Sequence, residues 1–287
     1  MTPRLASFQG LSLGGFHRVA YWEWGPRDAV RTLVCVHGLT RQGRDFDFLA
    51  QRFARSGWRV VCPDLVGRGR SGWLRHAEGY TLLQYGADMN ALLARLDVDQ
   101  VDWLGNSLGG LVGMMLAAQP GSPIRRLVIN DIGPYIPGTA LRRLGVYLNA
   151  PPPRFAGLGE AEAYLRATLA PFGALTDAQW RHLAEHSVRP DDAGGLLRHH
   201  DPAIAEAYRP WRLGSILMWD LWDKVACPTL VLRGSVSDML PASAAAEMTR
   251  RGPRAELVEF PAIGHLPALL DAGQIAPIVE FLDRARA

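Results

Sequence analysis

The sequence predicts an α/β protein with a mostly parallel, doubly wound sheet, because short apolar runs alternate with segments of helical periodicity. The apolar runs are rich in β-branched residues, which is typical of parallel strands covered on both faces. They are Thr32–Val36, Arg59–Cys62, Val101–Leu104, Leu127–Asn130 and Thr229–Leu232. This rhythm predicts strand–helix–strand units joined by right-handed crossovers.

Three further patterns extend this prediction. Apolar residues recur at spacings of three and four over Leu82–Leu96 and again over Leu108–Leu116, which indicates two helices that each bury one face. Alternating residues around Leu11 and Val19–Trp22 flank Gly14-Gly15, which predicts an early hairpin. A final helix is expected over 267–286.

The predicted domain organisation follows from a break in the rhythm. Between Asp131 and about Leu217 no strand-like apolar run occurs, and prolines separate short amphipathic segments. We therefore expect a helical cap over residues 134–216, inserted into an α/β core formed by residues 1–133 and 217–287.

Composition restricts the function classes. The 287 residues are 48% hydrophobic and 21% charged, which fits a globular chain and excludes disordered or collagen-like proteins. A net charge of +3 is too small to suggest nucleic-acid binding. Apolar stretches are too short to span a membrane, and the first 30 residues show no export signal, so a cytoplasmic protein is expected. We expect a monomer or a small homo-oligomer. The three cysteines form no C-x-x-C pair and predict buried thiols.

The strongest chemical signal is the G-x-S-x-G pentapeptide Gly105–Gly109, with Ser107 at its centre. It lies between a predicted strand and a predicted helix, where a sharp turn raises the serine hydroxyl above the carboxyl edge of the sheet. The two glycines provide the space that such a turn needs. Ser107 is therefore the candidate nucleophile.

A serine hydroxyl needs a base, and His265 is the candidate because it alone among the eight histidines follows the last predicted strands. Two carboxylates could orient its imidazole. Asp238 follows the strand Thr229–Leu232, and Asp131 ends the preceding strand. Asp238 is preferred because its loop is long enough to reach His265, whereas Asp131 is interpreted as a strand-ending cap.

An oxyanion formed during acyl transfer needs two backbone donors. The amide of Leu108, directly after the nucleophile, is one candidate. The amide of Leu39, in the loop after Thr32–Val36, is the other. His37 in the same loop is interpreted as a structural hydrogen-bonding residue rather than a second base.

Together these motifs resemble the α/β-hydrolases of the capped esterase, lactonase and carbon–carbon hydrolase lineage. The resemblance covers nearly the whole chain and rests on five ordered motifs: His37-Gly38, Asp64–Ser71, Gly105–Gly110, Gly234 with Asp238 and Pro241, and Gly264-His265. It implies a Ser107–His265–Asp238 triad, an acyl-enzyme, and no metal or organic cofactor. Serine at the nucleophile position differs from the aspartate of haloalkane dehalogenases and epoxide hydrolases.

The expected function is hydrolysis of carboxylic esters of small, largely apolar molecules, with Tyr147, Trp211 and Trp219 as candidate substrate contacts. One alternative is a carbon–carbon or enol-lactone hydrolase of aromatic breakdown products, whose substrate carboxylate an arginine of the cap would bind. A second alternative is a hydrolase-like module that binds a small molecule without turnover.

Two further motifs have simpler interpretations. Gly67–Gly72 matches the dinucleotide pattern G-x-G-x-x-G, but it does not directly join a strand to a helix, so a turn-rich loop braced by Asp64 and Ser71 is expected. His182-Leu-Ala-Glu-His186 matches the zinc-protease pattern H-x-x-E-H. No complete ligand set is identifiable from the sequence, so these histidines are interpreted as an exposed helix face and no metal is expected.

Overall fold

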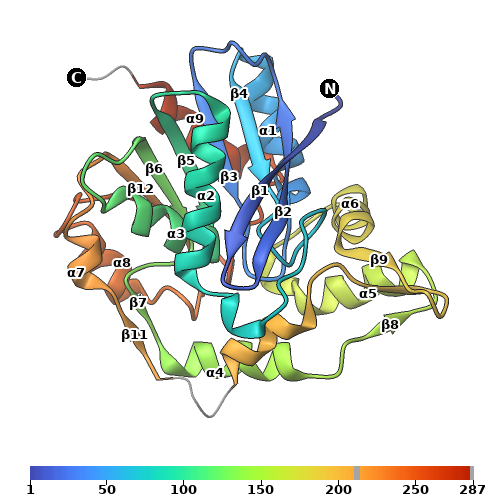
Figure 1. Ribbon diagram of the computed structural model, residues 1–287. Helices are drawn as coiled ribbons and strands as arrows, with labels where there is room; N and C mark the ends of the chain where they lie inside the picture. The colour runs from blue at the N-terminus through green and yellow to red at the C-terminus, as the bar shows by residue number, and fades with distance from the viewer. Residues whose placement is uncertain (210–213, 285–287) are drawn as a thin grey trace.

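The computed structural model describes residues 1–209 and 214–284, which contain a central sheet and nine α-helices (Figure 1). The sheet has eight strands in the order β1-β2-β4-β3-β5-β6-β12-β13. Strands β3 to β6, β12 and β13 pair in parallel, whereas β1 and β2 pair antiparallel. The predicted mostly parallel α/β fold is therefore confirmed.

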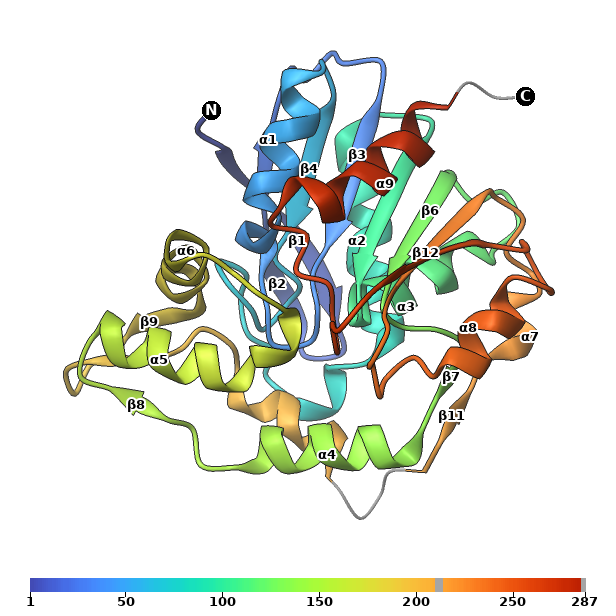
Figure 2. The same cartoon turned by 180° about the vertical axis from the view of Figure 1, so that it is seen from behind.

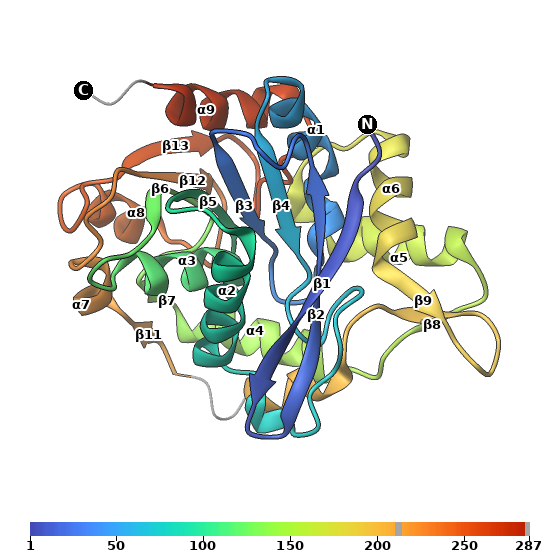
Figure 3. The ribbon, with the colours of Figure 1, turned by 45° about the horizontal axis from the view of Figure 1, so that its top comes forward.

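The strands of this sheet follow the predicted runs closely. Their bounds are β1 Arg4–Ser12, β2 Gly15–Trp24, β3 Thr32–Val36, β4 Arg59–Pro63, β5 Val101–Asn106, β6 Ile124–Asn130, β12 Thr229–Gly234 and β13 Glu256–Phe260. The predicted hairpin of β1 and β2 is present and turns at Leu13-Gly14, directly before Gly15. Figure 3 shows the order across the sheet, with β13 and the hairpin at opposite edges.

Helices cover both faces of the sheet because successive strand residues point to opposite sides. Val34 and Val36 of β3 pack in one cluster with helices α2 (Leu82–Leu96) and α3 (Leu108–Ala117). Leu33 and Cys35 pack in the other with α1 (Asp47–Arg55) and α9 (Ala272–Asp283). Figures 1 and 2, which view the molecule from opposite sides, show these two helical layers.

Two differences from the sequence prediction lie near the C-terminus. The edge strand β13 was not predicted, because its alternating residues include Glu256 and Glu259 and form no apolar run. The final helix begins at Ala272 instead of 267, with Asp271 accepting a hydrogen bond from the Gln274 amide as its N-cap. Residues 266–270 instead form an irregular, buried loop. Helix α8 spans Ala242–Met248.

The segment predicted as a cap leaves the core after β7 (Tyr135–Ile136) and returns at β11 (Ile216–Leu217), and these two short strands pair with each other. Figure 2 shows that α4 and α5 lie across one end of the sheet. The helices of the segment are α4 Gly138–Asn149, α5 Leu158–Thr168 and α6 Asp177–Ser187, and α7 Trp219–Trp222 follows β11.

The same segment is not wholly helical, contrary to expectation. Strands β8 (Arg154–Phe155), β9 (Val188–Pro190) and β10 (Leu196–Arg198) form a small antiparallel sheet. Each is too short to produce an apolar run in the sequence. Short 3-10 turns complete the chain at Gly43–Phe46, Ala77–Gly79, Ala170–Phe172 and Pro202–Tyr208.

None of the helices in the described ranges combines the length and apolar character that crossing a membrane requires.

Close packing of α3 on the sheet depends on Gly109. A Cβ at this position would lie 2.0 Å from the backbone oxygen of Val36, so α3 would have to move away from β3. We predict that Gly109→Ala lowers the free energy of unfolding by about 2–3 kcal/mol, measured by urea denaturation. The matched control is Gly159→Ala in α5, where no atom lies within 4 Å and the change should be neutral or slightly stabilising. Equal effects of the two substitutions would contradict this assignment.

Candidate functional site

Ser107 occupies a strained turn between β5 and α3. Its φ of 49° and ψ of −112° lie in a region that non-glycine residues rarely adopt. The turn is fixed at both ends, because the Ser107 amide donates to Asn130 O at 3.0 Å and the Gly110 amide donates to Ser107 O at 2.8 Å. A Cβ at Gly105 would lie 2.2 Å from the Gly109 carbonyl, so this tight crossing of strand and helix needs glycine.

His265 reaches Ser107 from the loop that follows β13. Its Nε2 lies 2.9 Å from Ser107 Oγ. Two hydrogen bonds hold this loop against the sheet: Val236 N donates to Ile263 O at 3.0 Å, and Asn130 Nδ2 donates to Pro267 O at 2.8 Å. The predicted pairing of the serine with this histidine is therefore present in the structure.

The carboxylate beside His265 belongs to Asp131. Its Oδ2 lies 2.8 Å from His265 Nδ1, and the side chain is fully buried. Asp131 also accepts hydrogen bonds from Gly234 N at 2.9 Å and from Ser237 Oγ at 2.6 Å. A serine, an imidazole and a carboxylate thus form one continuous line of contacts, in which Asp131 is held by the end of β12 and its loop.

The prediction that Asp238 lies beside His265 is wrong. Asp238 forms an ion pair with Arg143 of α4, with Arg143 Nε 2.6 Å from Asp238 Oδ2, and its side chain is 48% exposed. The preceding residue, Ser237, explains why the Asp238 side chain does not face His265. Ser237 points inward to Asp131 and also accepts a hydrogen bond from the Met239 amide, so Asp238 is directed toward the cavity.

The loop after β3 lies directly against Ser107. A Cβ at Gly38 would be 3.6 Å from Ser107 Cβ, and the next residue, Leu39, lies on the wall of the same cavity. Leu108 is the first residue of α3, directly after Ser107. The two amides predicted as oxyanion donors therefore belong to backbone segments that flank the serine hydroxyl.

His37 makes hydrogen bonds to two backbone segments, as expected for a structural residue. The ring is fully buried, its Nδ1 lies 2.7 Å from Gly38 O, and its Nε2 accepts the Leu65 amide at 2.9 Å. Burial, with the nearby Arg68 and Arg41 guanidinium groups, lowers the pKa of His37 to about 3. A neutral ring thus joins the loop after β3 to the loop after β4.

Ser107 and His265 open onto a cavity of about 590 Å³. Its wall combines core loops with residues of α4, among them Arg143, Leu144 and Tyr147. Residues Leu169, Pro171 and Phe172, which follow α5, add apolar surface. The volume and the mixture of apolar wall and few polar groups suit a small organic molecule.

The three predicted substrate contacts have different outcomes. Tyr147 lines the cavity. Within the described ranges Trp219 is absent from the cavity wall: it lies on α7, where Arg251 packs over its ring at 4.8 Å. Trp211 falls outside the described residues. Sequence reasoning missed Arg41 on the cavity wall, and it also missed Ser237 and Asn130, which hold Asp131 and the His265 loop.

The dinucleotide-like motif forms a loop, as expected. Asp64 accepts hydrogen bonds from the amides of Gly43 and Arg70, at 2.7 and 2.8 Å. Ser71 Oγ donates to Asp64 O, so the two predicted residues brace this turn. Burial raises the pKa of Asp64 to about 6 in spite of these bonds.

Comparison with known proteins gives consistent matches. Residues 31–272 match the family model for the alpha/beta hydrolase fold. A 3-hydroxybutyrate-oligomer hydrolase of Cupriavidus necator is 44% identical over 99% of both chains. A 2-(acetamidomethylene)succinate hydrolase of Mesorhizobium japonicum is 28% identical over 81% of both. The solved structure of an alpha/beta hydrolase from Novosphingobium aromaticivorans has a TM-score of 0.86 and 34% identity, covering 99% of this chain and all of that one.

The buried His37 predicts an acid-sensitive fold. An unfolded histidine binds a proton near pH 6.5, whereas native His37 does so near pH 3, so the free energy of unfolding should fall as the pH is lowered from about 6.5 toward 3. His37→Gln keeps an acceptor for the Leu65 amide and should reduce this pH dependence, measured by urea denaturation at pH 7.5 and 5. His200, whose pKa burial also lowers to about 3, should preserve part of it. An unchanged slope in the variant would refute the assignment.

Proposed function

The chain belongs to the α/β-hydrolase family, and on this basis we propose that it is a serine hydrolase that cleaves ester bonds in short 3-hydroxybutyrate oligomers. The observation that carries the proposal is the line of contacts from Ser107 Oγ, on the cavity wall, through His265 to the buried Asp131. The full-length similarity to an oligomer hydrolase supports the substrate class.

The proposed reaction begins with attack of Ser107 Oγ on the ester carbonyl carbon. His265 Nε2 accepts the hydroxyl proton, and Asp131 holds the Nδ1–H and stabilises the imidazolium that forms. The tetrahedral intermediate collapses by breaking the carbon–oxygen bond of the ester. His265 then gives its proton to the leaving alkoxide, which departs as the alcohol.

The second half of the reaction regenerates the enzyme. Water attacks the acyl carbon of the Ser107 ester while His265 Nε2 accepts one of its protons. Collapse of this second intermediate releases the carboxylic acid and returns the proton to Ser107 Oγ. In both halves the amides of Leu39 and Leu108 are the proposed donors to the oxyanion, each worth about 3 kcal/mol of transition-state stabilisation.

The cavity wall supports a small hydroxyacid ester. Leu144, Leu169 and Phe172 offer apolar contacts to methyl side groups, and a hydroxybutyrate oligomer also has a carboxylate at one end. Arg143 lies on the same wall, so we propose that it attracts this carboxylate. Residues 134–216, which supply Arg143 and much of the wall, are proposed to be the cap that selects the substrate.

The roles of the two aspartates can be separated by substitution. Ser107→Ala should lower kcat for ester hydrolysis about 10⁶-fold and Asp131→Asn about 10⁴-fold, because the amide cannot orient and stabilise the imidazolium. Asp238→Asn, the matched control, should change kcat less than about tenfold, since this carboxylate is half-exposed and paired with Arg143. Circular dichroism would verify that each variant is folded.

Two outcomes would count against this mechanism. Greater loss in Asp238→Asn than in Asp131→Asn would return the acid role to Asp238. Absence of both turnover and covalent labelling of Ser107 by a fluorophosphonate in the folded wild-type protein would favour a binding module without catalysis.

Substrate class can be tested on the same enzyme. The 3-hydroxybutyrate dimer should be hydrolysed with a higher kcat/KM than an enol-lactone or a vinylogous diketone acid from ring cleavage. Arg143→Gln should raise KM for the dimer by about fivefold, equivalent to roughly 1 kcal/mol, and leave KM for its methyl ester unchanged. A faster rate on the diketone acid would instead support the carbon–carbon hydrolase alternative.

A further inference from the structure

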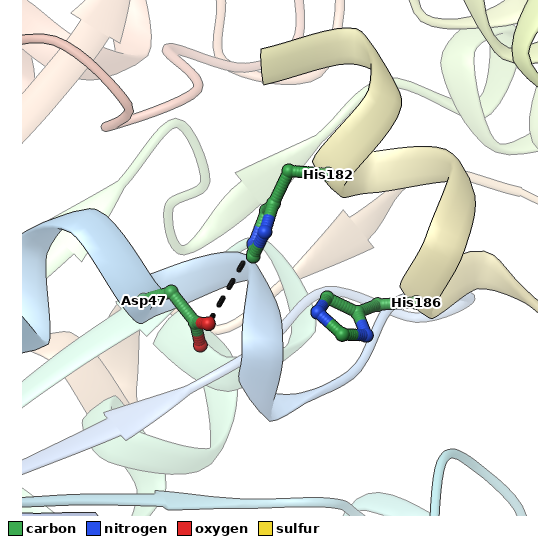
Figure 4. A group of neighbouring side chains, drawn as sticks. All are labelled: Asp47, His182 and His186. Atoms are coloured by element: carbon green, nitrogen blue, oxygen red, sulfur yellow. Dashed lines mark ion pairs between the residues drawn. The ribbon is translucent and has the colours of Figure 1, made fainter. Parts of the chain in front are cut away.

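Outside the Ser107 cavity, three side chains from the cap and the core lie close together. His182 and His186 are one turn apart on α6, and Asp47 is the first residue of α1 (Figure 4). One nitrogen from each histidine and one oxygen of Asp47 all lie within 4.8 Å of one another, and His182 Nε2 is 3.9 Å from Asp47 Oδ2. The prediction that these histidines form an exposed helix face is wrong, because both are partly buried between α6 and α1.

We propose that His182, His186 and Asp47 form a binding site for a divalent transition-metal cation, with Zn²⁺ as the best match. Zinc sites combine imidazole nitrogens with carboxylate oxygens at about 2.0–2.2 Å, in tetrahedral or related geometry. Histidines at positions i and i+4 of a helix present their nitrogens to the same side. A movement of each ring by about an ångström would bring three ligands around one ion, and water would complete the coordination.

The existing hydrogen bonds are compatible with this change. His182 Nε2 lies 2.9 Å from Arg44 O, so in the metal-free protein it donates a proton to this carbonyl. Binding through Nε2 requires the proton to move to Nδ1, which keeps the imidazole neutral. Asp47 is paired with Arg44, with Arg44 Nε 2.7 Å from Asp47 Oδ1, and a carboxylate has lone pairs enough to hold a guanidinium and a metal together.

Charges around the cluster bear on which cation it would bind. The guanidinium groups of Arg44 and Arg41 lie beside it, because Arg44 contacts Asp47 and Arg41 contacts Asp45. The same arginines oppose any cation, which disfavours ions held by charge alone. Asp47 and Asp45, each paired with one arginine, offset this repulsion. Borderline metals that bind imidazole strongly are therefore expected, in preference to Mg²⁺ or Ca²⁺.

The chemistry of a zinc protease is not part of this proposal. In the H-x-x-E-H pattern a glutamate next to the second histidine serves the reaction, but Glu185 is 50% exposed and lies 3.6 Å from Arg181. The position between α6 and α1 instead indicates a structural ion that joins cap and core. Because the buried face of α6 packs against Leu266, Ala268 and Leu270, such an ion would hold the helix that supports the His265 loop.

The direct test is binding of the metal alone to the full chain after chelator treatment. Titration calorimetry with ZnCl₂ and with NiCl₂ should give one saturable site per chain, and Zn²⁺ should raise the thermal unfolding midpoint, whereas MgCl₂ should do neither. His182→Gln, His186→Gln and Asp47→Asn should each weaken Zn²⁺ binding roughly tenfold or more. His76→Gln, which removes a histidine beside Gly14 that is not part of the cluster, is the matched control and should bind as the wild type does.

Each variant is compared with its own metal-free form, so a loss of intrinsic stability does not obscure the result. Wild-type Zn²⁺ affinity in the double variant His182→Gln/His186→Gln would overturn the proposal. The absence of saturable binding in the wild type, or an equal loss in His76→Gln, would do the same. These measurements do not depend on the proposed ester hydrolysis, so the two proposals can fail separately.

Discussion

The arrangement around Ser107 depends on burying one negative charge. The Asp131 carboxylate has no exposed surface, and taking a carboxylate out of water costs several kcal/mol unless it is hydrogen-bonded and paired. Gly234 N, Ser237 Oγ and His265 Nδ1 provide these contacts. They come from the end of β12 with its following loop and from the loop after β13, so satisfying this charge brings two separate parts of the chain together beside Ser107.

The rest of the fold makes that convergence possible. Parallel pairing of β5, β6 and β12 places their carboxyl ends next to one another, so Ser107, Asp131 and Ser237 follow neighbouring strands. Alternation along each strand gives two apolar faces, and the helices on them keep the sheet rigid. Positive φ values occur at Ser107 and Asp131, which directly follow the carboxyl ends of β5 and β6.

Local patterns predicted the parts of the structure that local physics determines. The strand Thr32–Val36 and the helix Leu82–Leu96 have the predicted limits, because apolar runs and helical periodicity are encoded in consecutive residues. Contact between Ser107 and His265 followed from the strand–turn–helix signal and from chain order. The sequence did not predict which carboxylate contacts His265. Ser237 points inward to Asp131, and this direction, rather than the length of the loop, decides where Asp238 points. Pairing of β8 with β10, and the approach of Asp47 to α6, join residues far apart in the sequence and leave no local pattern.

The segment between β7 and β11 is not a self-contained unit. Its buried residues Leu165, Phe172 and Trp180 share one apolar cluster with Leu266, Ala268 and Leu270, which directly follow His265 in the chain. A chimera that replaced this segment with that of a relative, cut only at β7 and β11, would leave the packing against Leu266, Ala268 and Leu270 mismatched. The loop that carries His265 would then be displaced. Exchanging this segment between relatives therefore requires residues 266–270 to be transferred with it.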